Sequence, residues 1–178
     1  MKKIILLLLS VIVFSCSNSD QPNTNNQQNQ VPETYSANIQ ALGMTLTSKP
    51  AFTSDNITFN NYCNWYEIKN NSQTVGYGIL LELNKQPGVK GADLYVEINS
   101  PTLTSGNTYD LSSGGSEITF PVNDVYSLNS LPNKVKSVTI TNISDNKISG
   151  TVNIAMRKNL TPFPETIVTG SFTKIPKL

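Results

Sequence analysis

The sequence predicts an all-β domain: an antiparallel β-sandwich or, as an alternative, a β-barrel, with about nine strands. Apolar and polar residues alternate with a period of two along most of the chain after residue 34, as in strands with one buried face. Turn-forming residues separate these runs, and no segment shows the 3.6-residue period of a helix. Many short strands separated by turns are typical of sandwiches and of calycin-like barrels.

The longest alternation lies in residues 147–158. Asp145 and Asn146 separate it from residues 135–141, so we expect these two segments to form a hairpin. Gly150 and Gly170 stand inside predicted strands, where glycine marks a bulge or a close approach of two strands. The remaining predicted strands are 35–41, 62–67, 77–83, 94–98, 108–111, 118–122 and 168–172.

The first fifteen residues have the pattern of a signal peptide. Lys2 and Lys3 precede an apolar run over residues 4–14 that only Ser10 interrupts. About eleven residues rise about 16 Å as a helix, which is short of the roughly 30 Å of a bilayer core. We therefore expect residues 1–15 to be removed during export and not to span the membrane.

The apolar run ends in Val13-Phe14-Ser15-Cys16. This sequence resembles the lipobox of bacterial lipoproteins, in which an aliphatic and a small residue precede the cysteine. The resemblance implies that signal peptidase II cleaves before Cys16 and that Cys16 carries acyl chains such as palmitate. Two or more acyl chains hold a protein stably at a membrane, so the membrane is the first partner that the sequence predicts.

Residues 16–33 are expected to be the lipidated cysteine and a flexible tether. The segment 17–33 consists almost wholly of Asn, Gln, Ser, Thr and Pro, with Val31 as its one apolar residue. Such a composition does not bury enough apolar area to offset its ordering entropy. The all-β domain would then occupy residues 34–178.

Four segments of the domain suggest where this protein resides. Residues 108–111 (TYDL), 137–141 (SVTIT), 148–152 (ISGTV) and 168–172 (VTGSF) resemble strands of small, uncharacterised lipoprotein domains of the Bacteroidota. The resemblance implies an all-β fold and a place in a Gram-negative cell envelope, at the outer membrane, but no activity. Surface-exported lipoproteins often carry an acidic cluster after the lipidated cysteine. Here Asp20 stands alone, so a periplasm-facing and a surface-exposed protein both stay open.

The amino-acid composition argues against several classes of function. The 178 residues include no histidine, which excludes Ser-His-Asp and Cys-His catalysis and histidine zinc sites. The 13 basic and 12 acidic residues form no basic cluster, so we expect no nucleic-acid binding. Aspartates near strand ends lack the spacing of a calcium loop. We expect no catalytic residue, no cofactor and no metal site.

Two cysteines are present, at positions 16 and 63. If Cys16 is acylated, Cys63 has no disulfide partner. We expect Cys63 to be a small buried residue, because no histidine is available to stabilise a thiolate.

An aromatic cluster is the strongest candidate for ligand binding. Tyr62, Trp65 and Tyr66 lie close together among amides, and in a strand Trp65 shares a face with Cys63 while Tyr62 and Tyr66 share the other. Core packing of Trp65 and a platform for a sugar are both open interpretations. Leu80 and Tyr95 stand at nominally solvent-facing positions of two further strands. The candidate ligand patch is Tyr62, Trp65, Tyr66, Leu80 and Tyr95.

Three functions are consistent with the sequence. The leading hypothesis is a non-enzymatic binding or interaction module for a glycan, a peptide or an envelope protein. The alternative is a barrel-type carrier of a small apolar ligand, which requires an unfilled interior. A minor alternative is a hydrolase that uses two carboxylates, for which Glu82 and Glu97 are the outward-facing candidates.

Overall fold

The computed structural model confirms the all-β antiparallel fold. It describes residues 35–48, 53–54, 57–58, 63–83, 91–120, 124–128, 133–158 and 164–178, and within these ranges it contains strands and no helix. The strands are β1 (Ser36–Ala41), β2 (Met44–Thr47), β3 (Thr53–Ser54), β4 (Ile57–Thr58), β5 (Asn64–Asn70), β6 (Gln73–Leu83), β7 (Ala92–Ile98), β8 (Thr108–Asp110), β9 (Glu117–Phe120), β10 (Asp124–Leu128), β11 (Lys136–Ser144), β12 (Lys147–Lys158) and β13 (Glu165–Pro176). Besides the predicted strands, these include β2, the short pair β3–β4 and β10.

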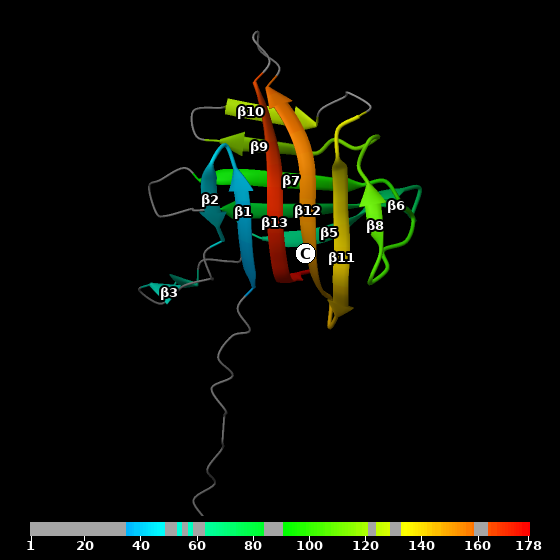
Figure 1. Ribbon diagram of the computed structural model, residues 1–178. Coiled ribbons are helices and arrows are strands. Elements are labelled where there is room, and N and C mark those ends of the chain that lie inside the picture. The colour runs from blue at the N-terminus through cyan, green and yellow to red at the C-terminus, as the bar shows by residue number, and fades with distance from the viewer. Residues whose placement is uncertain are drawn as a thin grey trace, which may run out of the picture. The chain divides into compact units, whose positions relative to one another are not determined.

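Eleven strands form one curled sheet whose two halves face each other across the core (Figure 1). The first layer has the order β2-β1-β13-β12-β11-β8, and the second has the order β10-β9-β7-β6-β5. The strands of the two layers cross at a steep angle (Figure 1), as in orthogonal sheet packing. The two layers enclose one core, as in a sandwich, and they are joined by hydrogen bonds, as in a barrel.

Strand β12 joins the two layers at one corner. Along one edge it pairs with β13 over nearly its whole length. Along the other edge its first part pairs with β11, and its last residues, Met156 to Lys158, pair with β10 of the second layer. At the opposite side, a bridge between Trp65 and Lys177 brings the end of the chain beside β5, and Ser48 bridges to Leu83.

Two-residue turns set the register of three hairpins. Asp145 and Asn146 both have positive φ, as a type I′ turn requires, and the predicted hairpin of β11 and β12 is confirmed. The hairpins β1–β2 and β5–β6 use Leu42-Gly43 and Asn71-Ser72, again with two positive φ values each. Asn and Gly adopt this conformation at little cost, whereas Leu42 adopts it at a steric cost.

The core consists of inward-facing residues from both layers. The largest fully buried side chains include Phe172, Ile39, Leu81 and Ile154. Phe120 and Tyr126 meet edge to face with ring centroids 5.7 Å apart. Aliphatic side chains from both layers thus occupy the space between them.

Gly150 and Gly170 lie where strands come unusually close, as predicted. A Cβ on Gly150 would stand 2.3 Å from the carbonyl oxygen of Thr139 and 2.6 Å from the ring of Phe172. A Cβ on Gly170 would stand 2.1 Å from the carbonyl oxygen of Asn38, and Gly170 has a φ of +152°. Only glycine fits either position without a shift of the neighbouring strand.

Candidate functional site

The outer face of the second layer brings together three of the five predicted patch residues. Leu80 on β6 pairs with Tyr95 on β7, and Asn64 of β5 pairs with Leu80 from the other side. Tyr66 lies two residues further along β5, on the same face. Tyr66, Leu80 and Tyr95 are all partly exposed. We call these three residues the tyrosine face.

Tyr66 lies along the sheet because its neighbour on β6 has no side chain. Gly78 is its cross-strand partner. A Cβ on Gly78 would stand 2.5 Å from Tyr66 Cζ and 2.9 Å from Cε1. The ring therefore crosses Gly78 toward β7 and does not project from the sheet. The end of the ring, from Cε1 to the hydroxyl, thus lies over the bare backbone of Gly78.

Tyr95 is fixed by hydrogen bonds to two neighbours. Its hydroxyl donates to Oε2 of Glu97 at 3.4 Å and shares a hydrogen bond with Tyr66. Burial, and then the hydrogen bond with Tyr66, raises the pKa of Tyr95 well above that of an ordinary phenol. Tyr95 therefore stays a neutral hydroxyl at physiological pH, and its ring position is defined.

Glu97 is positioned by the loop that precedes β9. The backbone N–H of Gly115 donates to Glu97 Oε2 at 3.3 Å, and the Ser116 hydroxyl accepts from the Glu97 N–H at 3.0 Å. A Cβ on Gly115 would stand 2.8 Å from the same carboxylate oxygen, so this close approach depends on glycine. The tyrosine face thus borders a fixed carboxylate acceptor. The outward position of Glu97 was predicted from the sequence, but the loop contacts that fix its carboxylate were not.

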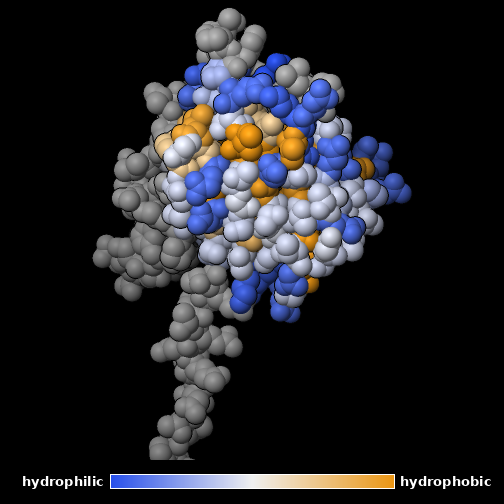
Figure 2. Space-filling model, viewed as in Figure 1, coloured by the Kyte–Doolittle hydropathy of each residue, from blue (hydrophilic) through white to orange (hydrophobic). Residues whose placement is uncertain are grey.

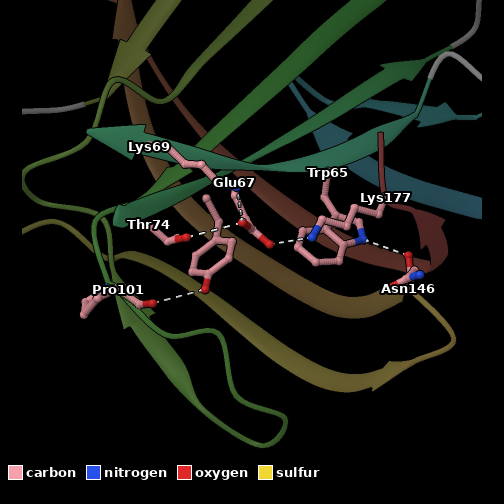
Figure 3. A network of polar contacts seen from close by, with 8 residues as sticks. Trp65, Glu67, Lys69, Thr74, Pro101, Asn146 and Lys177 are labelled. Carbon is pink, nitrogen blue, oxygen red and sulfur yellow. Dashed lines mark hydrogen bonds and ion pairs between the residues drawn. The ribbon is translucent and has the colours of Figure 1, made fainter. Parts of the chain in front are cut away.

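Trp65 lies on the inner side of β5, apart from the tyrosine face. It is 6% exposed and belongs to the core, as its shared face with buried Cys63 indicates. Its indole N–H donates to the carbonyl oxygen of Asn146 at 3.2 Å (Figure 3). Its ring centroid is 6.2 Å from that of Tyr77. Core packing is therefore the interpretation that the structure supports for Trp65.

A charged network covers the outer edge of Trp65. Lys177 places its Nζ 5.1 Å from the indole centroid and pairs with Glu67 (Figure 3). Lys69 Nζ lies 3.3 Å from the other carboxylate oxygen of Glu67, and the Thr74 hydroxyl donates to that oxygen at 3.3 Å. The hydrogen bond from Lys177, and then that from Lys69, lowers the pKa of Glu67. Both carboxylate oxygens are engaged, so this network closes the end of the core.

Cys63 is confirmed as a buried free thiol. Burial raises its pKa to about 12, and its Sγ lies 3.6 Å from the carbonyl oxygen of Glu82. A thiol with so high a pKa is a poor nucleophile at neutral pH. Two of the positions predicted from the sequence, Tyr62 and Cys16, lie outside the described residues.

The two carboxylates considered for hydrolysis are not neighbours. Glu82 pairs with Asp93, and Glu97 pairs with Gly78, four residues away from Glu82 along β6. Four residues of strand correspond to about 13 Å, which exceeds the roughly 5–9.5 Å between the acids of glycosidases. Among the described residues, no group of three or more acidic, cysteine or histidine side chains is arranged to hold a metal ion.

Comparison with protein-family models, with curated proteins and with solved structures found no match to this chain. Within the described part of the chain, no helix is long and apolar enough to cross a membrane.

Proposed function

We propose that this protein is a lipid-anchored cell-envelope protein whose folded domain is a non-enzymatic binding module. The anchor is proposed from the signal-peptide pattern and the lipobox-like sequence that ends in Cys16. Its place at the outer membrane of a Gram-negative bacterium of the Bacteroidota type is proposed from the lipoprotein-like segments of the domain.

The tyrosine face is the proposed ligand surface. The observation that carries this is the Tyr66 ring lying across Gly78, partly exposed beside Leu80 and Tyr95. Partly exposed aromatic rings on a surface suit stacking against the apolar face of a sugar ring. The Glu97 carboxylate and the two phenol hydroxyls supply hydrogen-bonding groups for ligand hydroxyls. A glycan is therefore the ligand class that we propose.

Two observations favour a module over the other candidate functions. Aliphatic side chains from both layers occupy the interior, whereas a carrier needs open apolar space. The register separates Glu82 from Glu97, whereas a carboxylate hydrolase needs two converging acids.

Affinity electrophoresis of the unit Val31–Leu178 in gels containing envelope polysaccharides tests the ligand surface. We expect retardation of the native protein and its loss in Tyr66→Leu, which keeps apolar bulk but removes the π-face. Val75→Ala, a change at an exposed position elsewhere on β6, is the matched control and should be retarded like the native protein. Equal retardation of Tyr66→Leu and the native protein would refute the proposed surface.

The anchor is tested separately in cells. A chemically tagged palmitate should label the native chain and should not label Cys16→Ser, which should also leave the membrane fraction. Labelling of Cys16→Ser would contradict the proposed anchor. Protease digestion of intact cells then separates a surface-exposed domain from one that faces the periplasm.

A further inference from the structure

The outer face of the first layer is uncharged across its centre. Over three cross-strand rows on β1, β13, β12 and β11, none of the described outward positions carries a charge. Figure 2 shows this face, pale over much of its centre, with apolar residues gathered toward one end and charged residues beyond them. The polar positions are Asn38, Gln40, Ser137, Thr139, Thr151, Asn153, Thr169 and Ser171.

One of the three rows is wholly apolar. Ile167 on β13 pairs with Ala155 on β12, and the Ala155 N–H donates to the carbonyl oxygen of Val135 at 2.7 Å. On the other side, Leu42 follows β1 and its N–H donates to the Thr166 hydroxyl at 3.0 Å. Ile167 is 64% exposed, Val135 54% and Leu42 39%, whereas Ala155 is only 6% exposed. We call Leu42, Ile167, Ala155 and Val135 the apolar row.

The composition of this face is that of an interface. Contiguous exposed apolar residues on a soluble domain mark an interaction site, and the centres of protein interfaces are depleted in charge. Charges of both signs border the apolar row: Lys134 pairs with Glu165 at 2.6 Å, and Arg157 is the cross-strand partner of Glu165. A border of mixed sign suits a protein partner better than an anionic membrane.

We propose that a second copy of this chain packs on the apolar row, related by a two-fold axis that runs parallel to the strands between β12 and β13. With this axis, an outward β13 residue of one copy faces a β12 residue of the other copy. That β12 residue is the one with which the β13 residue pairs within its own sheet. Ile167, the most protruding residue of the row, then meets the partner's Ala155, which is small and recessed. Leu42 meets the partner's Val135 at both ends of the row.

The same axis also matches charge and polarity. Glu165 faces the partner's Arg157, so opposite charges meet across the interface. In the row on the other side, Thr169 faces the partner's Asn153, a hydroxyl opposite an amide. A large residue meets a small one, an acid meets a base and a donor meets an acceptor. This complementarity of the face with itself is why we choose a second copy as the occupant.

The contact is small, so the dimer should be weak in solution. Four strands at about 4.8 Å spacing give a row about 14 Å long, and stable dimers bury about 800 Å² per partner over a wider area. We expect a dissociation constant for the dimer on the order of tens to hundreds of micromolar.

Sedimentation equilibrium of Val31–Leu178, the unit that holds every described core residue, tests the proposal over a concentration series up to about 1 mM. We expect the mass to rise from one copy toward two in the native protein. Ile167→Asp should stay a single copy. Val75→Asp, which adds the same charge at another exposed β-branched position, should dimerise like the native protein. Thermal unfolding of each variant shows that it is folded.

The variant Ala155→Leu distinguishes the two-fold packing from nonspecific hydrophobic association. It adds apolar surface, so unspecific association would increase. In the proposed packing it fills the space for Ile167 of the other copy, and dimerisation should fall at least tenfold. A single-copy mass for the native protein at all concentrations, or stronger association of Ala155→Leu, would overturn the proposal.

Discussion

A single methyl group at Gly78 tests the arrangement of the tyrosine face. In Gly78→Ala the new Cβ would stand 2.5 Å from Tyr66 Cζ and 2.7 Å from the Tyr66 hydroxyl oxygen. Carbon atoms in contact lie about 3.5–4.0 Å apart, so the ring has to withdraw by about 1–1.5 Å. A hydrogen bond does not survive a displacement of that size. The hydrogen bond between Tyr66 and Tyr95 should therefore be lost.

The pKa of Tyr95 reports this loss. Burial and the hydrogen bond with Tyr66 are the two largest causes that raise it. Without the second cause the pKa should fall toward that of an ordinary phenol, while burial keeps it above that value. Stability should change by less than about 1 kcal/mol, because a hydrogen bond contributes about 0.5–1.5 kcal/mol and alanine is favoured over glycine in a strand by about 0.5–1 kcal/mol.

The assay is an alkaline titration followed by ¹³C NMR of labelled tyrosine Cζ atoms, with circular dichroism to define the pH range in which the fold persists. Tyr66→Phe keeps the ring and removes its hydroxyl, so it should lower the pKa of Tyr95 as well. Gly76→Ala lies on the same strand and face, but its Cβ would meet the carbonyl oxygen of Ile98 at 2.8 Å and no tyrosine. An unchanged pKa of Tyr95 in both Gly78→Ala and Tyr66→Phe would refute the network.

Three further predictions concern the interior and the network that closes it. Trp65→Phe removes the indole hydrogen bond to Asn146 and should lower the free energy of unfolding in urea by about 1–2 kcal/mol; unchanged stability would show that this bond contributes nothing. Lys177 lowers the pKa of Glu67 in the folded protein. Their ion pair therefore stabilises the fold at pH values above the unfolded carboxyl pKa of about 4.3. This stabilisation is lost as the pH falls through the lower pKa that Glu67 has in the folded protein. The urea midpoint of Glu67→Gln should then depend less on acid pH than that of the native protein, and an equal dependence would contradict this sign. Cys63, with a pKa of about 12, should react with a thiol reagent at neutral pH only after unfolding, so rapid labelling of the folded unit would contradict its burial.

Local patterns were enough to predict much of the fold. The alternation in β12 and the Asp145-Asn146 turn gave the hairpin, because residue period and turn chemistry are both properties of adjacent residues. The same period placed Cys63 and Trp65 on the inner face. The turn at Leu42-Gly43 and the strand β2 that follows it were not predicted, because leucine is not a residue type that favours positive φ.

The features that define the surfaces depend on register between distant segments. Tyr66 reaches across β6 because Gly78 is its partner, and the carboxylate of Glu97 is held beside Tyr95 by a loop eighteen residues further on. The apolar row joins residues 42, 135, 155 and 167, which lie at least twelve residues apart in the chain. No sequence window contains such a row, and only the order of strands in the sheet assembles it.

Strand β12 has hydrogen-bonded neighbours on both edges, and one of these edges is divided between β11 and β10. Its amides should therefore be among the slowest of the described residues to exchange with solvent. Because this one strand pairs with strands of both layers, we expect the unfolding of the two layers to be coupled. A factor that bound the edges of β12 before they paired would keep both layers from forming, and its release would let the layers close together.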